Sequence, residues 1–292
     1  MNSSRITAAL ACVFIVLATA VSPAFAAAPT PLARAHAHND YLHERPLQDA
    51  LDRGFMSVEA DIWLVGDDLL VAHDFEDIDP DRTLESLYLD PLLQRVRGNG
   101  GEVYDGSPHY LTLLIDIKSE AVSTYLELHR TLRRYRQILT TFTPGGVDVR
   151  SVTAIVSGNR TREVMQAQRV RYAGYDGRLG DLGGSDPADL IPLISDNWTS
   201  HFTWTGEGPI PEDELAELNR IVETAHANGQ RVRFWATPDA PGEARTALWQ
   251  VLLDAGVDHL NTDDLSGLQE FLLTHDPDPS TPHVGLTETA LE

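Results

Sequence analysis

The sequence contains almost no cysteine and little positive charge. Cys12 is the single cysteine in 292 residues, and it lies in an apolar N-terminal segment. A mature chain that has lost this segment cannot form a disulfide or use a thiolate. Acidic residues outnumber basic ones by 44 to 22, which gives a net charge of −22, and no long basic run occurs. Nucleic acids and anionic lipid surfaces repel such a chain, so we expect neither as a partner.

The N-terminal segment differs in composition from the rest of the chain. Arg5 follows a polar start, residues 6–21 are apolar, and Ala24-Phe25-Ala26 places small residues where a signal peptidase cleaves. We therefore predict a signal peptide over residues 1–26, a linker over residues 27–33, and a secreted chain without a membrane anchor. An uncleaved anchor is the alternative, although the apolar run is about as short as a spanning helix can be.

No Gly-rich phosphate loop follows the first predicted strand, which argues against a nucleotide-binding open sheet. From residue 34 to residue 274, short apolar segments alternate with amphipathic ones. Eight predicted strands precede helices and end near His38, Leu64, Ile117, Val156, Ala173, Ile194, Ala236 and Asn261. Eight such units over about 240 residues predict a (β/α)8 TIM barrel, with a doubly wound sheet as the alternative. The Pro- and Asp-rich residues 275–292 are expected to be a disordered tail.

Two carboxylates lie on one face of the second predicted strand. Side chains alternate across a strand, so Glu59 and Asp61 point to one side while their apolar neighbours point to the other. Like charges about 7 Å apart on a buried strand repel each other unless a cation lies between them. The chain then turns at residues 66–68 and brings His73 back towards the carboxylates. This hairpin is therefore a candidate metal and catalytic site.

Further polar side chains lie where the first and third predicted strands end. His36 and His38 belong to the first strand, and Asp116 and Lys118 end the third. Barrel enzymes carry their functional groups at these carboxyl ends. Together with the two carboxylates of the second strand, Asp116 offers only oxygen ligands, which suit Mg²⁺ or Ca²⁺ better than Zn²⁺. We predict one divalent cation, Mg²⁺ or Ca²⁺.

A metal ion, two imidazoles and a lysine are the groups that phosphodiester cleavage needs. The metal and Lys118 hold the phosphate, one imidazole takes a proton from the nucleophile, and the other donates one to the leaving oxygen. A glycosidase that uses Glu59 and Asp61 is an alternative, but two residues of one strand lie on one side of a pocket. A catalytically silent extracellular binding protein is the other alternative, and it would bind metal without turnover.

Several motifs resemble the superfamily of glycerophosphodiester phosphodiesterases and phosphatidylinositol-specific phospholipases C. They are HAHNDY at 36–41, PLQDALDRGFMSVEADIWL at 46–64, LLVAHD at 69–74 and LLIDIK at 113–118. Four further motifs look like the subgroup named after altered inheritance of mitochondria protein 6: RTLESLYLDPL at 82–92, SGNR at 157–160, YDGRL at 175–179 and SDNW at 195–198. The resemblance covers nearly the whole mature chain.

The resemblance implies a TIM-barrel phosphodiesterase with three groups of site residues. The metal ligands are Glu59, Asp61 and Asp116; the catalytic histidines are His36 and His73; the substrate-binding residues are His38, Lys118 and Trp235. The first histidine of the family falls on His36, but His38 shares its face and could do the same work. The implied substrate is a glycerophosphodiester or a (lyso)phospholipid, with water or an internal hydroxyl as the nucleophile. We expect a monomer.

Overall fold

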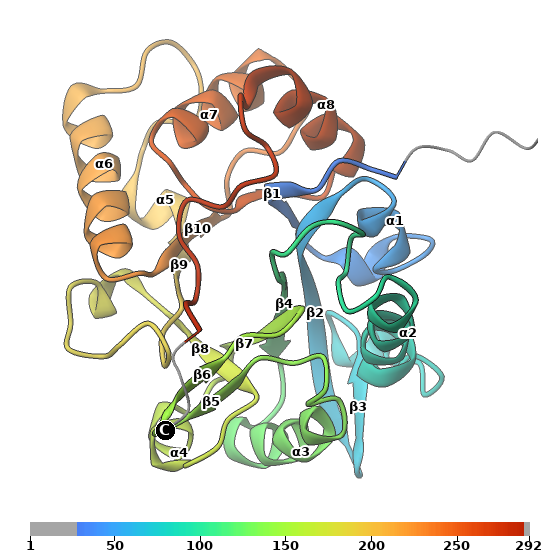
Figure 1. Cartoon of the computed structure of the whole chain (residues 1–292). Coiled ribbons are helices and arrows are strands. Elements are labelled where there is room, and N and C mark those ends of the chain that lie inside the picture. The colour runs from blue at the N-terminus through green and yellow to red at the C-terminus, as the bar shows by residue number, and fades with distance from the viewer. Residues whose placement is uncertain (1–27, 289–292) are drawn as a thin grey trace, which may run out of the picture.

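The computed structural model describes residues 28–288, so the predicted signal peptide, residues 1–26, lies outside the described part. Parallel strands form a barrel with helices around it (Figure 1). The barrel strands are β1 (Leu32–Ala37), β2 (Phe55–Val65), β4 (Leu111–Ile117), β7 (Val152–Gly158), β8 (Ala173–Gly177), β9 (Leu193–Asn197), β10 (Arg231–Trp235) and β11 (Leu260–Thr262). Their order is β10-β9-β8-β7-β4-β2-β1-β11, and one parallel bridge between Arg233 and His259 joins the two ends. The predicted (β/α)8 fold is confirmed as a nearly closed barrel.

The remaining elements connect and cover these strands. The α-helices are α1 (Gln48–Leu51), α2 (Asp90–Gly98), α3 (Ala121–Arg134), α4 (Arg162–Ala167), α5 (Trp198–His201), α6 (Glu212–Ala227), α7 (Glu243–Asp254) and α8 (Leu265–His275). Short 3₁₀ turns lie at η1 (Asp40–Leu42), η2 (Phe75–Asp77) and η4 (Leu179–Asp181), and a π-helical turn at η3 (Glu85–Leu89). Strand β3 (Asp68–Val71) pairs antiparallel with β2, and β5 (Thr141–Thr143) with β6 (Gly146–Asp148).

One barrel strand lies later in the chain than the sequence predicted. The fifth strand was expected to end near Ala173, but β8 begins there. Its sequence, AGYDG, contains two glycines and an aspartate, which have low strand propensity. The strand forms because Asp176 is buried and accepts hydrogen bonds from Ser157 and Ser195 on neighbouring strands. Tertiary pairing therefore overrides the local preference.

Residues 276–288 pack against the amino-terminal end of the barrel. A disordered tail was expected over residues 275–292, whereas residues 276–288 lie across the ends of β8 to β10 in Figure 1, and residues 289–292 lie outside the described part. Arg34 is buried and donates to Asp276 at 2.7 Å and to Nε2 of His283 at 3.0 Å. Arg231 donates to the carbonyl of Val284 at 2.9 Å. The tail is held because these two buried guanidinium groups need hydrogen-bond acceptors.

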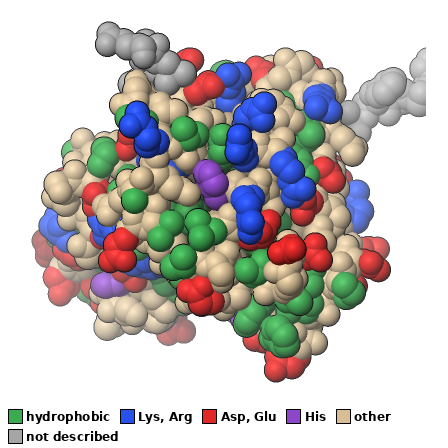
Figure 2. Space-filling model, turned by 90° about the horizontal axis from the view of Figure 1, so that it is seen from below, with side chains coloured by type: hydrophobic (Ala, Val, Ile, Leu, Met, Phe, Trp, Pro, Cys, Tyr) green, Lys and Arg blue, Asp and Glu red, His purple; other side chains and the backbone are tan. Residues whose placement is uncertain are grey.

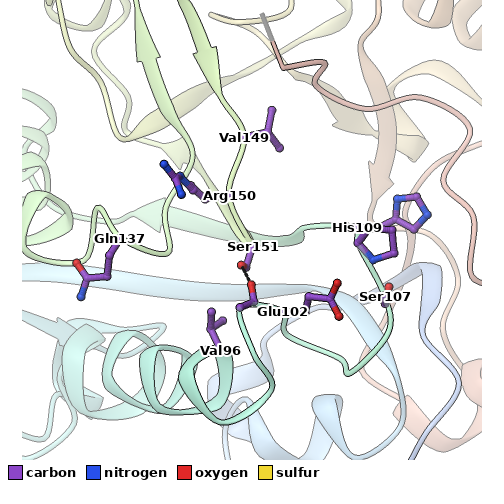
Figure 3. A pocket seen from close by; sticks show the side chains of 10 residues that line it. Val96, Glu102, Ser107, His109, Gln137, Val149, Arg150 and Ser151 are labelled. Carbon is purple, nitrogen blue, oxygen red and sulfur yellow. Dashed lines mark hydrogen bonds between the residues drawn. The ribbon is translucent and has the colours of Figure 1, made fainter. Parts of the chain in front are cut away.

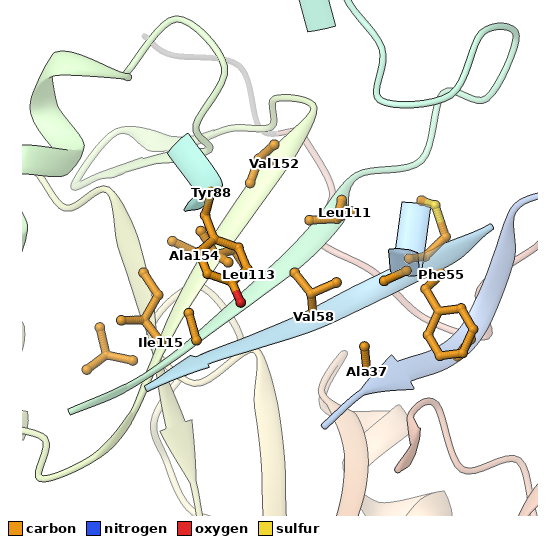
Figure 4. Packing of buried hydrophobic residues seen from close by; sticks show 14 of the residues in the cluster. Ala37, Phe55, Val58, Tyr88, Leu111, Leu113, Ile115, Val152 and Ala154 are labelled. Atoms are coloured by element: carbon orange, nitrogen blue, oxygen red, sulfur yellow. The ribbon is translucent and has the colours of Figure 1, made fainter. Parts of the chain in front are cut away.

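The main hydrophobic core lies between the barrel and its helices. Val58, Leu113 and Ile115 point outward from adjacent strands and pack with Tyr88 (Figure 4). Inside the barrel, Leu114, Ile155 and Leu193 form a separate small cluster. Buried polar side chains account for much of the remaining interior, and they include Arg34, His36, Glu59, Asp61, Asp176, Arg231 and Arg233. Buried charges are costly unless they are paired, so the arrangement of partners inside the barrel shapes the site.

Charge is unevenly distributed on the surface. On the face shown in Figure 2, acidic side chains surround a more central group of Lys and Arg side chains beside a histidine. Among residues 28–288, no helix has both the length and the apolar composition needed to cross a membrane.

The turn that carries the HAHNDY motif is anchored by a buried acid. Asp40 is fully buried, and its Oδ2 accepts from the backbone N–H of Leu47 at 2.6 Å and from the hydroxyl of Tyr88 at 2.9 Å. Its Oδ1 is buried and has no hydrogen-bond partner among the described residues. Burial raises the pKa of Asp40 to about 7, although the two hydrogen bonds oppose the rise.

We predict that Asp40→Asn weakens the pH dependence of stability. The folded-state pKa lies above the unfolded value, so the contribution of Asp40 to stability is complete below about pH 4 and declines as the pH rises to about 7. In the variant, the amide oxygen of the new side chain can keep both acceptor contacts. Between pH 5 and pH 8 the wild type should lose about 2 kcal/mol more unfolding free energy than the variant, as measured by urea denaturation with chelator present. Equal losses in the two proteins would contradict this assignment.

Candidate active site

Three carboxylates converge at the carboxyl end of the barrel. Asp61 of β2 pairs in register with Asp116 of β4, and Glu59 lies two residues earlier on the same face of β2. One oxygen of each carboxylate lies within 4.8 Å of the other two. Glu59 and Asp116 line a cavity of about 500 Å³, and Asp61 is buried beside them. The lining residues are His38, Asn39, Glu59, His73, Asp116, Lys118, Ser157, Arg178, Arg233 and Trp235. The predicted alternation of β2 has therefore brought the acids to one place.

Lys118 bridges two of these carboxylates. It is the only lysine in the sequence, and its Nζ lies 3.0 Å from Oδ2 of Asp61 and 3.2 Å from Oδ1 of Asp116. Burial would lower the pKa of Lys118, but the two carboxylates outweigh this effect and raise it. The lysine is thus held as a cation between two strands, on the face predicted from its spacing to Asp116.

The two oxygens of Asp61 have different surroundings. Oδ2 accepts from Tyr41 at 2.7 Å, and Lys118 and Nδ1 of His73 lie at 3.0 and 2.9 Å. Oδ1 is buried and has no hydrogen-bond partner within residues 28–288. An orphaned anionic oxygen beside two further carboxylates is what a hard divalent cation would satisfy. The residues present therefore fit a metal ion held by Glu59, Asp61 and Asp116.

The charge of each acid is set by its neighbours. Burial and the adjacent Glu59 raise the pKa of Asp61, and burial raises that of Asp116 to about 6. Glu59 behaves differently: burial would raise its pKa, but Arg233, 2.6 Å away, outweighs burial and holds the pKa well below the ordinary value. Glu59 is therefore an anion with its own buried counterion.

Two accessible imidazoles flank the carboxylates, and each has a carboxylate at Nδ1. Nδ1 of His73 lies 2.9 Å from Asp61, and Nδ1 of His38 lies 2.8 Å from Asp263. Burial would lower the pKa of His38, but the hydrogen bond to Asp263 and the charge of Glu59 outweigh it and raise the pKa. A proton on Nδ1 satisfies each carboxylate and leaves Nε2 available for the cavity.

His36 does not occupy the position expected of a catalytic histidine. It is fully buried, its Nδ1 lies 2.7 Å from the hydroxyl of Ser57, and its Nε2 lies 3.2 Å from Glu59. Burial lowers its pKa to about 3, and it does not line the cavity. His38, two residues later, does line it. His36 therefore packs beneath Glu59 and His38 reaches the cavity, which favours His38 over the expected His36 for a catalytic role.

Several residues of the site were not predicted. Arg233 lies two residues before the predicted Trp235 on the same face of β10, so strand alternation could have indicated it. Tyr41 lies within the HAHNDY motif, and its hydroxyl donates to Asp61. Arg178 and Ser157 belong to the YDGRL and SGNR motifs, but nothing local in the sequence places them in the cavity.

A second cavity lies at the opposite end of the strands. Its volume is about 360 Å³, and its lining includes Glu102, His109, Arg150 and Ser151 (Figure 3). These residues precede β4 and β7, at the amino ends of the barrel strands. Barrel enzymes carry their functional groups at the carboxyl ends, so the cavity beside the three carboxylates is the candidate active site.

Models of two phosphodiesterase families match parts of this chain. A model of the AIM6-like phosphodiesterase domain matches residues 25–176, and one of the glycerophosphoryl diester phosphodiesterase family matches residues 231–266. The structure is also similar to phosphatidylinositol-specific phospholipase C from Listeria monocytogenes, with a TM-score of 0.49 and 10% identity over 86% of this chain and 96% of that one.

Curated relatives match over most of their length. Altered inheritance of mitochondria protein 6 from Eremothecium gossypii is 31% identical over 272 residues, which cover 82% of this chain and 69% of that protein. The homolog from Arthroderma benhamiae is 29% identical over 268 residues, or 81% of this chain and 82% of that protein. On the match to the domain model and to these relatives, the chain belongs to the AIM6-like phosphodiesterase family.

Proposed function

We propose that this chain is a secreted phosphodiester hydrolase that depends on one divalent cation, Mg²⁺ or Ca²⁺, and uses His38 and His73 as its acid and base. The observation that carries the proposal is the pair of cavity-lining imidazoles, each with Nδ1 against a carboxylate, on either side of three converging acids. Membership in a phosphodiesterase family supports the reaction class. The proposed substrate is a glycerophosphodiester or a (lyso)phospholipid-type phosphodiester.

Glu59, Asp61 and Asp116 would hold the cation. When bound, the cation would withdraw charge from a phosphate oxygen and so assist displacement at phosphorus. Oδ1 of Asp61 is the best-prepared oxygen, because Oδ2 is already occupied by three donor groups. Lys118 stands between two of these acids and adds positive charge where negative charge grows on the phosphate.

The two imidazoles would move the protons. Carboxylates at Nδ1 fix the tautomer and orient Nε2, so that one ring accepts a proton from the attacking hydroxyl and the other donates one to the leaving oxygen. Asp61 orients His73, and Asp263 orients His38. Glu59 is unsuited to the proton-donor role that a glycosidase needs, because Arg233 and His36 hold it as an anion.

The metal proposal predicts that Asp116→Asn is nearly inactive. Asp116 forms an ion pair only with Lys118 among the described residues, so its isosteric replacement should leave the fold intact. Loss of one anionic ligand should lower kcat/KM for bis(p-nitrophenyl) phosphate by about 100-fold or more. Wild-type activity should disappear with chelator and return with added Mg²⁺ or Ca²⁺. Titration calorimetry should show weakened metal binding in the variant.

Asp254→Asn is the matched control, because this exposed acid lies on α7 and its side chain has Gln250 as its only hydrogen-bond partner within residues 28–288. It should keep wild-type activity and metal affinity. Full turnover of the wild type in chelator would refute the metal dependence, and metal binding without turnover would favour a silent binding protein.

The proposal also predicts different outcomes for the three histidines. His38→Ala and His73→Ala should each lower kcat by about 10²- to 10⁴-fold, because each removes a group that transfers a proton. Since both rings are partly exposed, the unfolding free energy should change little. His36→Gln should chiefly lower stability, because it alters a fully buried ring beneath Glu59. Steady-state kinetics and urea denaturation separate the two effects.

His109→Ala, in the cavity at the amino end of the barrel, is the control and should match the wild type. Wild-type kcat in His38→Ala, together with a large loss in a stable His36→Gln, would return the catalytic role to His36.

A further inference from the structure

Three motifs that the proposed chemistry does not use meet on one wall of the cavity. Ser157 comes from SGNR, Asp176 and Arg178 from YDGRL, and Ser195 from SDNW. Asp176 is fully buried, and it accepts from Ser157 at 2.7 Å and from Ser195 at 2.6 Å. Nη1 of Arg178 donates to Asp176 at 2.7 Å and to Ser195 at 3.1 Å. Side chains of strands β7 to β9 therefore hold one guanidinium group in place at the cavity.

Only one side of this guanidinium group is used by the protein. Nη1 makes its short contacts, whereas Nη2 reaches only the hydroxyl of Ser157, at 3.5 Å. Nε has no hydrogen-bond partner within residues 28–288. Arg178 lines the cavity together with Ser157 and Trp235. Nε and Nη2 form the edge that binds carboxylate or phosphate oxygens in pairs, so a preorganised anion-binding edge is left for a ligand.

Arg178 also lies over the ring of Trp235, which is the aromatic side chain that a cationic group of a substrate would contact. Its guanidinium carbon lies 4.7 Å from the centre of the Trp235 ring, within the range of a cation–π contact. Trp235 is a residue of the cavity lining. A quaternary ammonium group would compete for this ring face and meet like charge beside it. The wall therefore disfavours a cationic substituent.

We propose that Arg178 binds a second anionic group of the substrate, so that the enzyme selects phosphodiesters whose alcohol carries a carboxylate or phosphate over those that carry a quaternary ammonium. This inference rests on the proposed phosphodiester hydrolysis and names the substrate class. The phosphodiester lies at the three carboxylates and Lys118, and the second anion lies at Arg178, on the wall formed by β8 and β10. Arg233 differs, because its Nε donates to Asn261 and its Nη2 donates to Glu59 and Asn261, so the corresponding edge is already used by the protein.

Three chromogenic substrates test the proposal, because they share a leaving group and differ only in the other ester. They are the p-nitrophenyl phosphodiesters of 2-carboxyethanol, 3,3-dimethylbutanol and choline, whose alcohol substituents are anionic, neutral and cationic, respectively. At fixed free Mg²⁺ or Ca²⁺, the wild type should have kcat/KM at least about tenfold higher for the carboxyethyl than for the choline diester, with the neutral diester between them. Equal values, or a preference for choline, would overturn the proposal.

The double variant Arg178→Ala with Asp176→Asn removes the guanidinium group without leaving a buried unpaired acid. Its ratio of kcat/KM for the carboxyethyl over the choline diester should fall by at least about tenfold. Arg162→Ala is the matched control, since Arg162 pairs with Asp181 and Asp186 and does not line the cavity, and it should keep the wild-type ratio. An unchanged ratio in a folded double variant would also overturn the proposal.

Turnover tests the proposed hydrolysis, and the difference in Kd between two diesters tests the role of Arg178, so the two proposals can fail separately. If the wild type cleaves none of the three diesters, the proposed hydrolysis is wrong, and the intact diesters then serve as equilibrium ligands. Titration calorimetry should still give a tighter Kd for the carboxyethyl diester than for the choline diester, and the double variant should lose this difference. If the wild type shows no difference in Kd, the role of Arg178 is disproved independently of turnover.

Discussion

Charged side chains buried inside the barrel must be paired, and this requirement shapes both ends of the molecule. Most TIM barrels fill this space with layers of branched apolar side chains, whereas here the apolar part is the cluster of Leu114, Ile155 and Leu193. Charged groups inside must find partners across strands. Glu59 pairs with Arg233, and Asp61 with Lys118. At the base of the barrel, Arg34 and Arg231 are satisfied by the C-terminal segment, which explains why residues 276–288 are packed.

The candidate site consists of the groups that this pairing leaves incomplete. Oδ1 of Asp61 has no partner in the described part of the chain, while Oδ2 has three. His38 and His73 use Nδ1 against carboxylates and keep Nε2 for the cavity. Arg178 uses Nη1 and keeps its other edge. Each incomplete group is rigidly held by its occupied side, which is the preorganisation that binding and catalysis require.

The part of the site that could be predicted from sequence is the part that strand alternation determines, namely which face of a strand each side chain lies on. Glu59, Asp61 and Lys118 lie on the predicted faces because alternation needs no tertiary information. Alternation does not report depth along the barrel, so it could not separate His36 from His38. β1 and its neighbours bury His36 beneath Glu59, whereas His38 follows the strand and faces Asp263, 225 positions later in the chain. Likewise, no local pattern relates Arg178 to Trp235.

The chemistry and spacing of neighbouring residues are enough to set the βα alternation, the strand faces and the carboxylate character of the candidate cation site. Contacts between segments far apart in the chain set which histidine is accessible, which oxygen of Asp61 is unpaired among the described residues, and where residues 276–288 pack. These outcomes follow from barrel closure, which sets the register and depth of strands far apart in the chain. Electrostatic pairing acts over a few ångströms in space, and residue spacing along one strand carries no information about partners on another.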